Sequence, residues 1–135
     1  MMMTTMLIAD DEASIRRLVV AACSSATRRV IEAPDGDAAW DIIQRARPTI
    51  VLIDVQMPGQ TGLELTRRIR AAAGVECTRV VLLSAKTQAS DVEAGMNAGA
   101  DRYVTKPFSI VELLAVVENE LSRVGRGQPP GFRSR

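Results

Sequence analysis

The stretch TIVLIDVQMPG, residues 49–59, decides the fold. The four apolar residues at 50–53 are typical of a strand that is buried on both faces, as in a parallel sheet. This strand ends in Asp54, and Pro58-Gly59 supplies turn chemistry soon afterwards. An unpaired carboxylate is costly to bury. Asp54 therefore needs compensating partners, and the rest of the chain indicates which residues they are.

The composition is that of an ordinary globular domain. The chain has 135 residues, is 47% hydrophobic and 24% charged, and carries a net charge of +1. This length fits one domain, and the balanced charge gives no electrostatic case for nucleic acid or a membrane surface. No apolar run is long enough for a membrane span, and the start lacks a signal-peptide pattern. We therefore expect no contact with nucleic acid or membrane.

The cysteine and histidine counts narrow the chemistry. Cys23 and Cys77 are too few and too isolated for a disulfide framework or a zinc site, and two free thiols indicate a cytoplasmic protein. The absence of histidine excludes His-based metal sites, Ser-His-Asp triads and a phosphohistidine carried by this chain.

Strands and helices are expected to alternate along the chain. The apolar runs are 6–9, 30–33, 50–53, 80–83 and 102–105, and the helical stretches are 13–24, 36–46, 63–73, 90–98 and 110–122. Ser90 with Glu93, and Ser109 with Glu112, fit capping boxes at two helix starts. Five such units predict an α/β fold with a doubly wound, five-stranded parallel sheet and helices on both faces.

Reactive side chains follow four of the five strands, where ligands bind in open α/β sheets. They are Asp10, Asp11, Asp54, Ser84 and Lys106. Each of these residues alone could be an ordinary helix cap, turn, loop or solvated residue. If all of them were, five reactive side chains would have collected at one end of the sheet by accident, which is a poor explanation. Clustered carboxylates suit Mg²⁺, and an added hydroxyl and ammonium suit a phosphoryl group. Asp54 is the natural nucleophile, with Asp10 and Asp11 holding the metal.

Four segments carry a family resemblance. LIADDEAS (7–14), LIDVQMPGQTG (52–62), VVLLSAK (80–86) and AGADRYVTKPF (98–108) together resemble the response-regulator receiver domain of two-component signalling. The resemblance covers residues 1–124 as one receiver domain, and it implies a flavodoxin-like (βα)5 sheet with strand order 2-1-3-4-5. Residues 125–135 are expected to form a disordered tail.

The resemblance implies roles for the residues at the rim of the sheet. Asp54 would accept a phosphoryl group from a histidine kinase or phosphotransfer protein. Mg²⁺ would be held by Asp11, Asp54, the backbone carbonyl of Gln56 and, through a water, Asp10. Ser84 and Lys106 would contact the phosphoryl group, Tyr103 would change rotamer with Ser84, and the Lys106–Pro107 peptide would be cis. Family members often carry threonine where this chain has Ser84.

The implied function is a switch more than a metabolic enzyme, because the chain catalyses only its own phosphorylation and dephosphorylation. Its signal would leave through the fourth helix, fifth strand and fifth helix to a downstream protein that the sequence does not identify. We expect a monomer or a weak phosphorylation-dependent dimer. Two alternatives stay open: a haloacid-dehalogenase-like phosphatase, and a receiver-shaped interaction module that is not phosphorylated.

Overall fold

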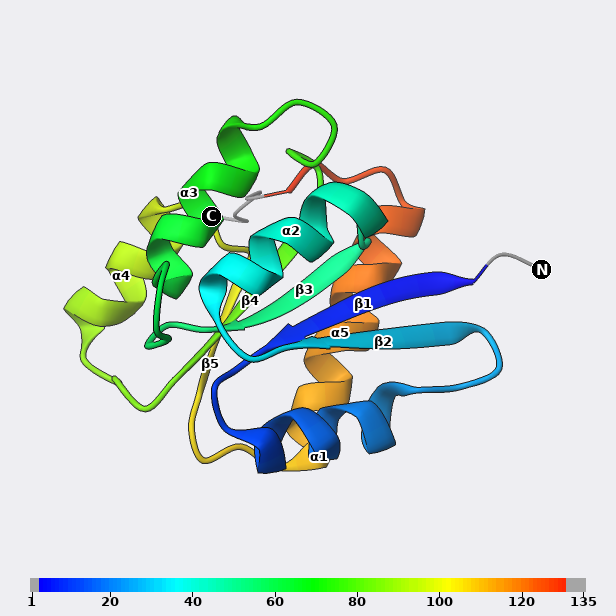
Figure 1. Ribbon diagram of the computed structural model, residues 1–135, viewed down its shortest axis with the longest axis horizontal. Helices are drawn as coiled ribbons and strands as arrows, with labels where there is room; N and C mark the ends of the chain where they lie inside the picture. The colour runs from blue at the N-terminus through cyan, green and yellow to red at the C-terminus, as the bar shows by residue number, and fades with distance from the viewer. Residues whose placement is uncertain (1–2, 131–135) are drawn as a thin grey trace.

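A computed structural model describes residues 3–130 of the chain. Five strands form one parallel sheet in the order β2-β1-β3-β4-β5, which confirms the predicted topology. The elements are β1 (Thr4–Ala9), α1 (Ala13–Cys23), β2 (Arg28–Ala33), α2 (Gly36–Ala46), β3 (Ile50–Asp54), α3 (Gly62–Ala71), β4 (Arg79–Ser84), α4 (Ala89–Asn97), β5 (Arg102–Thr105) and α5 (Ile110–Gly125). Figure 1 shows the sheet between two layers of helices.

The two faces of the sheet bury separate hydrophobic cores. In β3, Ile50 and Leu52 pack with residues of α1 and α5, whereas Val51 and Ile53 pack with residues of α2 and α3. All four side chains are fully buried. This two-sided burial explains the uninterrupted apolar run, and each such side chain contributes about 1.5–3 kcal/mol. The packing makes β3 a rigid support for the residue at its end.

Helix starts agree only partly with the predicted caps. Ser109 accepts a hydrogen bond from the Glu112 backbone N–H at 3.0 Å at the start of α5, which is one half of the predicted capping box. The prediction for Ser90 is wrong, because α4 begins at Ala89 after Gln88 and Ser90 already lies inside the helix. A complete capping box forms instead at α3, between Thr61 and Glu64. Among the described helices, none is long and apolar enough to cross a bilayer.

The end of the chain keeps its contacts beyond the predicted domain boundary. α5 continues to Gly125, and the backbone carbonyls of Gln128 and Pro129 accept hydrogen bonds from Arg79. The boundary at residue 124 and the disordered tail stay predictions. Residues 131–135 of that tail lie outside the described part of the chain.

Candidate functional site

Three carboxylates meet where β1 and β3 end. Asp10 and Asp11 follow β1, Asp54 closes β3, and the two strands are hydrogen-bonded neighbours. One carboxylate oxygen from each residue lies within 4.8 Å of the others. Asp10 and Asp54 are buried, while Asp11 is exposed. The structure therefore brings together the acids that the sequence placed at this rim, in a spacing that oxygen ligands of one cation could adopt.

Backbone contacts hold the two buried carboxylates in place. Asp10 Oδ1 accepts from the Glu12 N–H at 2.9 Å, and Asp54 Oδ1 accepts from the Gln56 N–H at 3.1 Å. Gly62, the first residue of α3, packs directly on the Asp54 backbone. A Cβ at Gly62 would lie 2.6 Å from the Asp54 carbonyl oxygen, so only glycine fits there without a shift of the backbone. Tight packing behind the strand end thus fixes the direction of the Asp54 side chain.

Lys106 reaches the acidic cluster from the end of β5. Its Nζ lies 2.8 Å from Asp10 Oδ2, 3.5 Å from Asp54 Oδ2 and 4.0 Å from Glu12 Oε1. Its ammonium is therefore paired mainly with Asp10, and Asp54 is the second partner. The Lys106–Pro107 peptide is cis, as predicted.

The protonation of the cluster follows from burial and charge. Burial, and then the charge of Asp10, raise the pKa of Asp54 to about 6, although the Gln56 N–H and Lys106 act in the opposite direction. Burial lowers the pKa of Lys106, but its hydrogen bond to Asp10 and the charges of both aspartates outweigh burial and leave that pKa raised. Lys106 is thus charged at neutral pH, while Asp54 titrates near pH 6, below neutrality.

Ser84 and Tyr103 lie farther along the same rim. Ser84 ends β4, is buried, and its Oγ accepts from the Lys86 N–H at 3.0 Å. Tyr103 is half-buried on β5, and its hydroxyl donates to the Lys86 carbonyl at 2.8 Å. Gly95 of α4 lets this ring pack closely, because a Cβ there would lie 3.0 Å from it. Ser84 and Tyr103 therefore contact the same residue of the β4–α4 loop.

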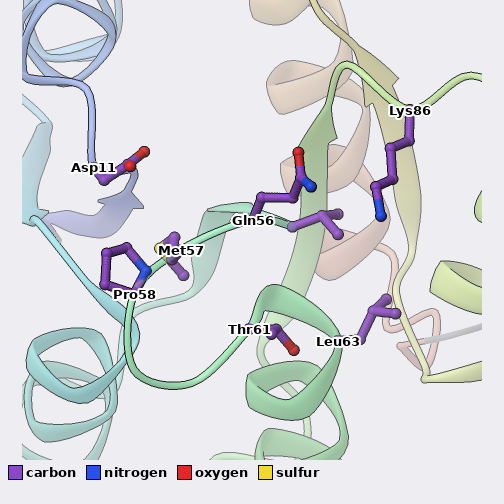
Figure 2. A pocket seen from close by; sticks show the side chains of 8 residues that line it. Asp11, Gln56, Met57, Pro58, Thr61, Leu63 and Lys86 are labelled. Atoms are coloured by element: carbon purple, nitrogen blue, oxygen red, sulfur yellow. The ribbon is translucent and has the colours of Figure 1, made fainter.

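Two cavities open at the cluster. One, of about 260 Å³, is lined by Asp11, Glu12, Asp54, Gln56, Ala85 and Lys106. The other, of about 500 Å³, shares Asp11 and Gln56 and extends over the loop after β3. Figure 2 shows Asp11 and Lys86 on opposite sides of this second cavity, with Gln56 between them, Met57 and Pro58 on the side of Asp11, and Thr61 and Leu63 along another wall. The buried Asp54 carboxylate is thus reachable from solvent beside Asp11.

Sequence reasoning missed residues that support the site. Arg16 of α1 donates from Nη1 to the Asp10 carbonyl at 2.7 Å and from Nε to Glu32 Oε1 at 3.2 Å. Lys86 joins Ser84 to Tyr103 through its backbone. Gly62 lies within the motif LIDVQMPGQTG, but its close approach to Asp54 is visible only in three dimensions. Charge and glycine content alone do not distinguish these positions from ordinary surface or turn residues.

Comparisons with known proteins agree on one family. The model of the response regulator receiver domain matches residues 6–118. The chain is 37% identical over 123 residues to the phosphate regulon transcriptional regulatory protein PhoB of Pseudomonas aeruginosa, covering 91% of this chain and 54% of PhoB. It is 38% identical to the transcriptional regulatory protein CseB of Streptomyces avermitilis, covering 96% of this chain and 54% of CseB. The chain thus spans about half the length of these relatives.

Solved structures give the same result. The chemotaxis response regulator CheY4 of Vibrio cholerae superposes with a TM-score of 0.82 at 30% identity, covering 87% of this chain and 98% of CheY4. The BeF3-activated DrrB receiver domain superposes with a TM-score of 0.81 at 32% identity, covering 90% of this chain and all of that one.

Proposed function

The chain belongs to the response regulator receiver domain family of two-component signalling, and on that basis we propose that Asp54 accepts a phosphoryl group in a Mg²⁺-dependent reaction. The donor would be a histidine kinase or a phosphotransfer protein. The observation that carries the proposal is the position of Asp54: a buried carboxylate at a strand end, 3.5 Å from an ammonium and lining a cavity. The family match does not support the phosphatase alternative.

The reaction proposed for Asp54 is an in-line transfer. With a pKa of about 6, Asp54 is mostly ionised at neutral pH and can act as the nucleophile. Its carboxylate oxygen forms a bond to phosphorus while the phosphorus–nitrogen bond of the donor phosphohistidine breaks. The electron pair stays on the imidazole nitrogen, which takes a proton from solvent. The product is an acyl phosphate on Asp54.

Lys106 and Ser84 are suited to hold the transferred group. The ammonium of Lys106 lies between Asp10 and Asp54, so a small movement would bring it from the first carboxylate to a phosphoryl oxygen. The Ser84 hydroxyl oxygen accepts from Lys86, which leaves its hydrogen available for a second phosphoryl oxygen. These contacts would develop with the negative charge of the transferring group, which is when they assist the reaction.

The donor set fits a magnesium ion. Three carboxylates with oxygens within 4.8 Å of one another, one of them exposed, offer the hard oxygen ligands that Mg²⁺ prefers. We assign Asp11, Asp54 and the Gln56 carbonyl as direct ligands, and Asp10 as a ligand through water. When bound, the ion neutralises carboxylate and phosphoryl charge.

The proposal extends to the fate of the signal. The acyl phosphate would be hydrolysed at the same site, so the domain would turn over only its own phosphoryl group. Phosphorylation adds a charge of about −1.5 to −2. Ser84 and Tyr103 both contact Lys86, in the loop between β4 and α4, so a movement of Ser84 would be passed to this loop and to β5. We propose that the face formed by α4, β5 and α5 changes as a result. A downstream protein would recognise that face. The two unpaired cysteines, Cys23 and Cys77, support a cytoplasmic location.

Asp54→Asn tests the assignment, because it keeps the shape of the side chain and removes the nucleophile. After incubation with a small phosphodonor and Mg²⁺, the parent chain should gain the mass of one phosphoryl group and the variant none. Asp41→Asn, an equal change on the exposed surface of α2, should be labelled like the parent. Stoichiometric labelling of Asp54→Asn would refute the proposal, and no labelling of the parent would favour the module that is not phosphorylated.

A further inference from the structure

The residues after α5 form a defined turn. Gly127 has a φ of +72°, and its N–H donates to the Val124 carbonyl at 3.0 Å. The Gln128 N–H donates to the Arg123 carbonyl, also at 3.0 Å. These two bonds and the left-handed glycine make a Schellman motif, which ends a helix and reverses the chain. The segment is therefore folded back from α5 toward the ends at which the strands begin, opposite the acidic cluster at their carboxyl ends.

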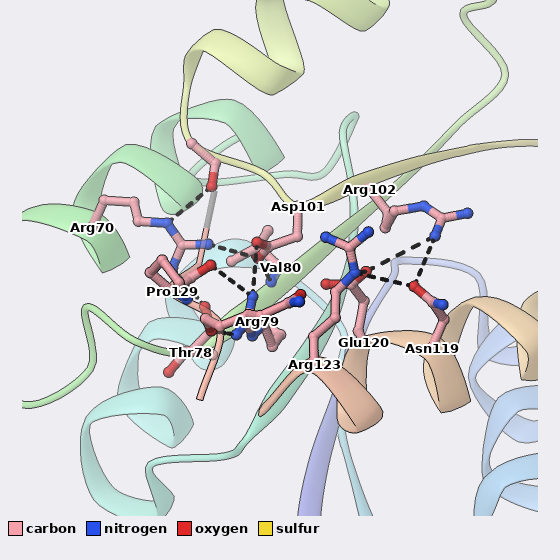
Figure 3. A network of polar contacts seen from close by, with 12 residues as sticks. Arg70, Thr78, Arg79, Val80, Asp101, Arg102, Asn119, Glu120, Arg123 and Pro129 are labelled. Carbon is pink, nitrogen blue, oxygen red and sulfur yellow. Dashed lines mark hydrogen bonds and ion pairs between the residues drawn. The ribbon is translucent and has the colours of Figure 1, made fainter. Parts of the chain in front are cut away.

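A buried arginine receives this segment. Arg79, the first residue of β4, is 2% exposed, and its Nη1 donates to the Pro129 carbonyl at 3.0 Å. Its Nη2 donates to the Gln128 carbonyl. Figure 3 shows Arg79 between Pro129 and Asp101. The two carbonyls thus accept from a guanidinium that has almost no access to solvent.

Side chains alone leave Arg79 incompletely compensated. Its Nη1 is 3.5 Å from Asp101, whereas Arg70 lies closer to the same carboxylate at 2.8 Å. Its Nε has no hydrogen-bond partner among the described residues. A buried cation is destabilising unless its donors are paired. Among the described residues, Nη1 thus donates both to Asp101 and to the Pro129 carbonyl, whereas the Gln128 carbonyl of the folded-back segment is the only acceptor for Nη2.

We propose that residues 126–130 are a strap that docks on Arg79, and that this docking fixes the direction in which the chain leaves the domain. The position matters because the curated relatives are about twice as long as the matched region, so their chains extend beyond a single receiver domain. Arg79 also begins the strand that ends in Ser84. The inference does not depend on the phosphorylation of Asp54.

A thermodynamic cycle tests the contact. Truncation after Gly127 should raise the unfolding equilibrium constant about tenfold or more in the parent chain, because it leaves donors of a buried charge unpaired. In Arg79→Met the same truncation should have a much smaller effect. Arg70→Met is the matched control, since Arg70 pairs with Asp101 but donates to none of the described strap residues. Equal truncation effects in the parent and in Arg79→Met would overturn the proposal.

A distance measurement in the full chain gives an independent test. Cys77 is exposed and Cys23 is buried, so a nitroxide can be attached selectively to Cys77, which lines one cavity with Val124 of α5. The label should broaden the Gly127 and Gln128 amide NMR signals in the parent and in Arg70→Met, and clearly less in Arg79→Met. No broadening in the parent would overturn the proposal even if Arg79→Met failed to fold. Equal broadening in all three chains would do the same.

Discussion

Asp54→Asn should stabilise the metal-free protein, and increasingly so as the pH rises. The folded state raises the pKa of Asp54 from an ordinary value of 3.8 to about 6. Between these values the folded chain holds a proton that the unfolded chain has lost, so the parent loses stability as the pH rises through this window. The full difference corresponds to about 3 kcal/mol. Asparagine carries no charge, and the variant therefore escapes this loss.

The assay is urea unfolding of parent and variant in EDTA, from about pH 4.5 to about pH 7.5, across the window in which the two states differ in protonation. The free energy of unfolding of Asp54→Asn minus that of the parent should increase over this range and level off above pH 6. Asp41→Asn should show no such trend, because Asp41 is exposed. A difference that is flat or decreases with pH would refute the reasoning from burial and the charge of Asp10.

Two further predictions concern the metal and the signal. Asp11→Ala should lower Mg²⁺ affinity and slow phosphorylation, because it removes the exposed member of the acidic cluster. Isothermal titration calorimetry measures the Mg²⁺ affinity. An unchanged affinity would mean that Asp11 is only a turn residue. A phosphoryl mimic with Mg²⁺ should shift the amide NMR signals of residues 84–98 and 101–106, and Tyr103→Ala should weaken partner binding without blocking phosphorylation. Shifts confined to residues that touch the mimic would contradict a route through Tyr103.

The fold could be predicted because the central strands appear in the sequence as short apolar runs. Burial on both faces leaves no room for polar residues, so the runs in β3 and β4 stand out from the amphipathic helices between them. The position of the site could be predicted because the carboxyl ends of parallel strands lie at the same end of the sheet. The capping prediction at Ser90 failed because α4 begins at Ala89, so Ser90 lies inside the helix and Gln88 takes the N-cap position without a side-chain hydrogen bond.

Contacts between side chains could not be predicted in the same way. Lys106 was expected to contact a phosphoryl group on Asp54, but its Nζ lies nearer to Asp10, at 2.8 Å, than to Asp54, at 3.5 Å. Arg79 and Glu120 are both buried, although charged side chains are usually exposed. Lone charged residues carry no periodic signal, so their burial becomes visible only when the strands and α5 are packed together.

The alternation of β3 between two cores restricts how the length of this chain can change. Ile50 and Leu52 belong to one core, and Val51 and Ile53 belong to the other. One residue inserted into this strand would exchange every following side chain between the cores and turn the terminal carboxylate to the opposite face of the sheet. We therefore expect insertions to be tolerated in the connections between elements and not within β3.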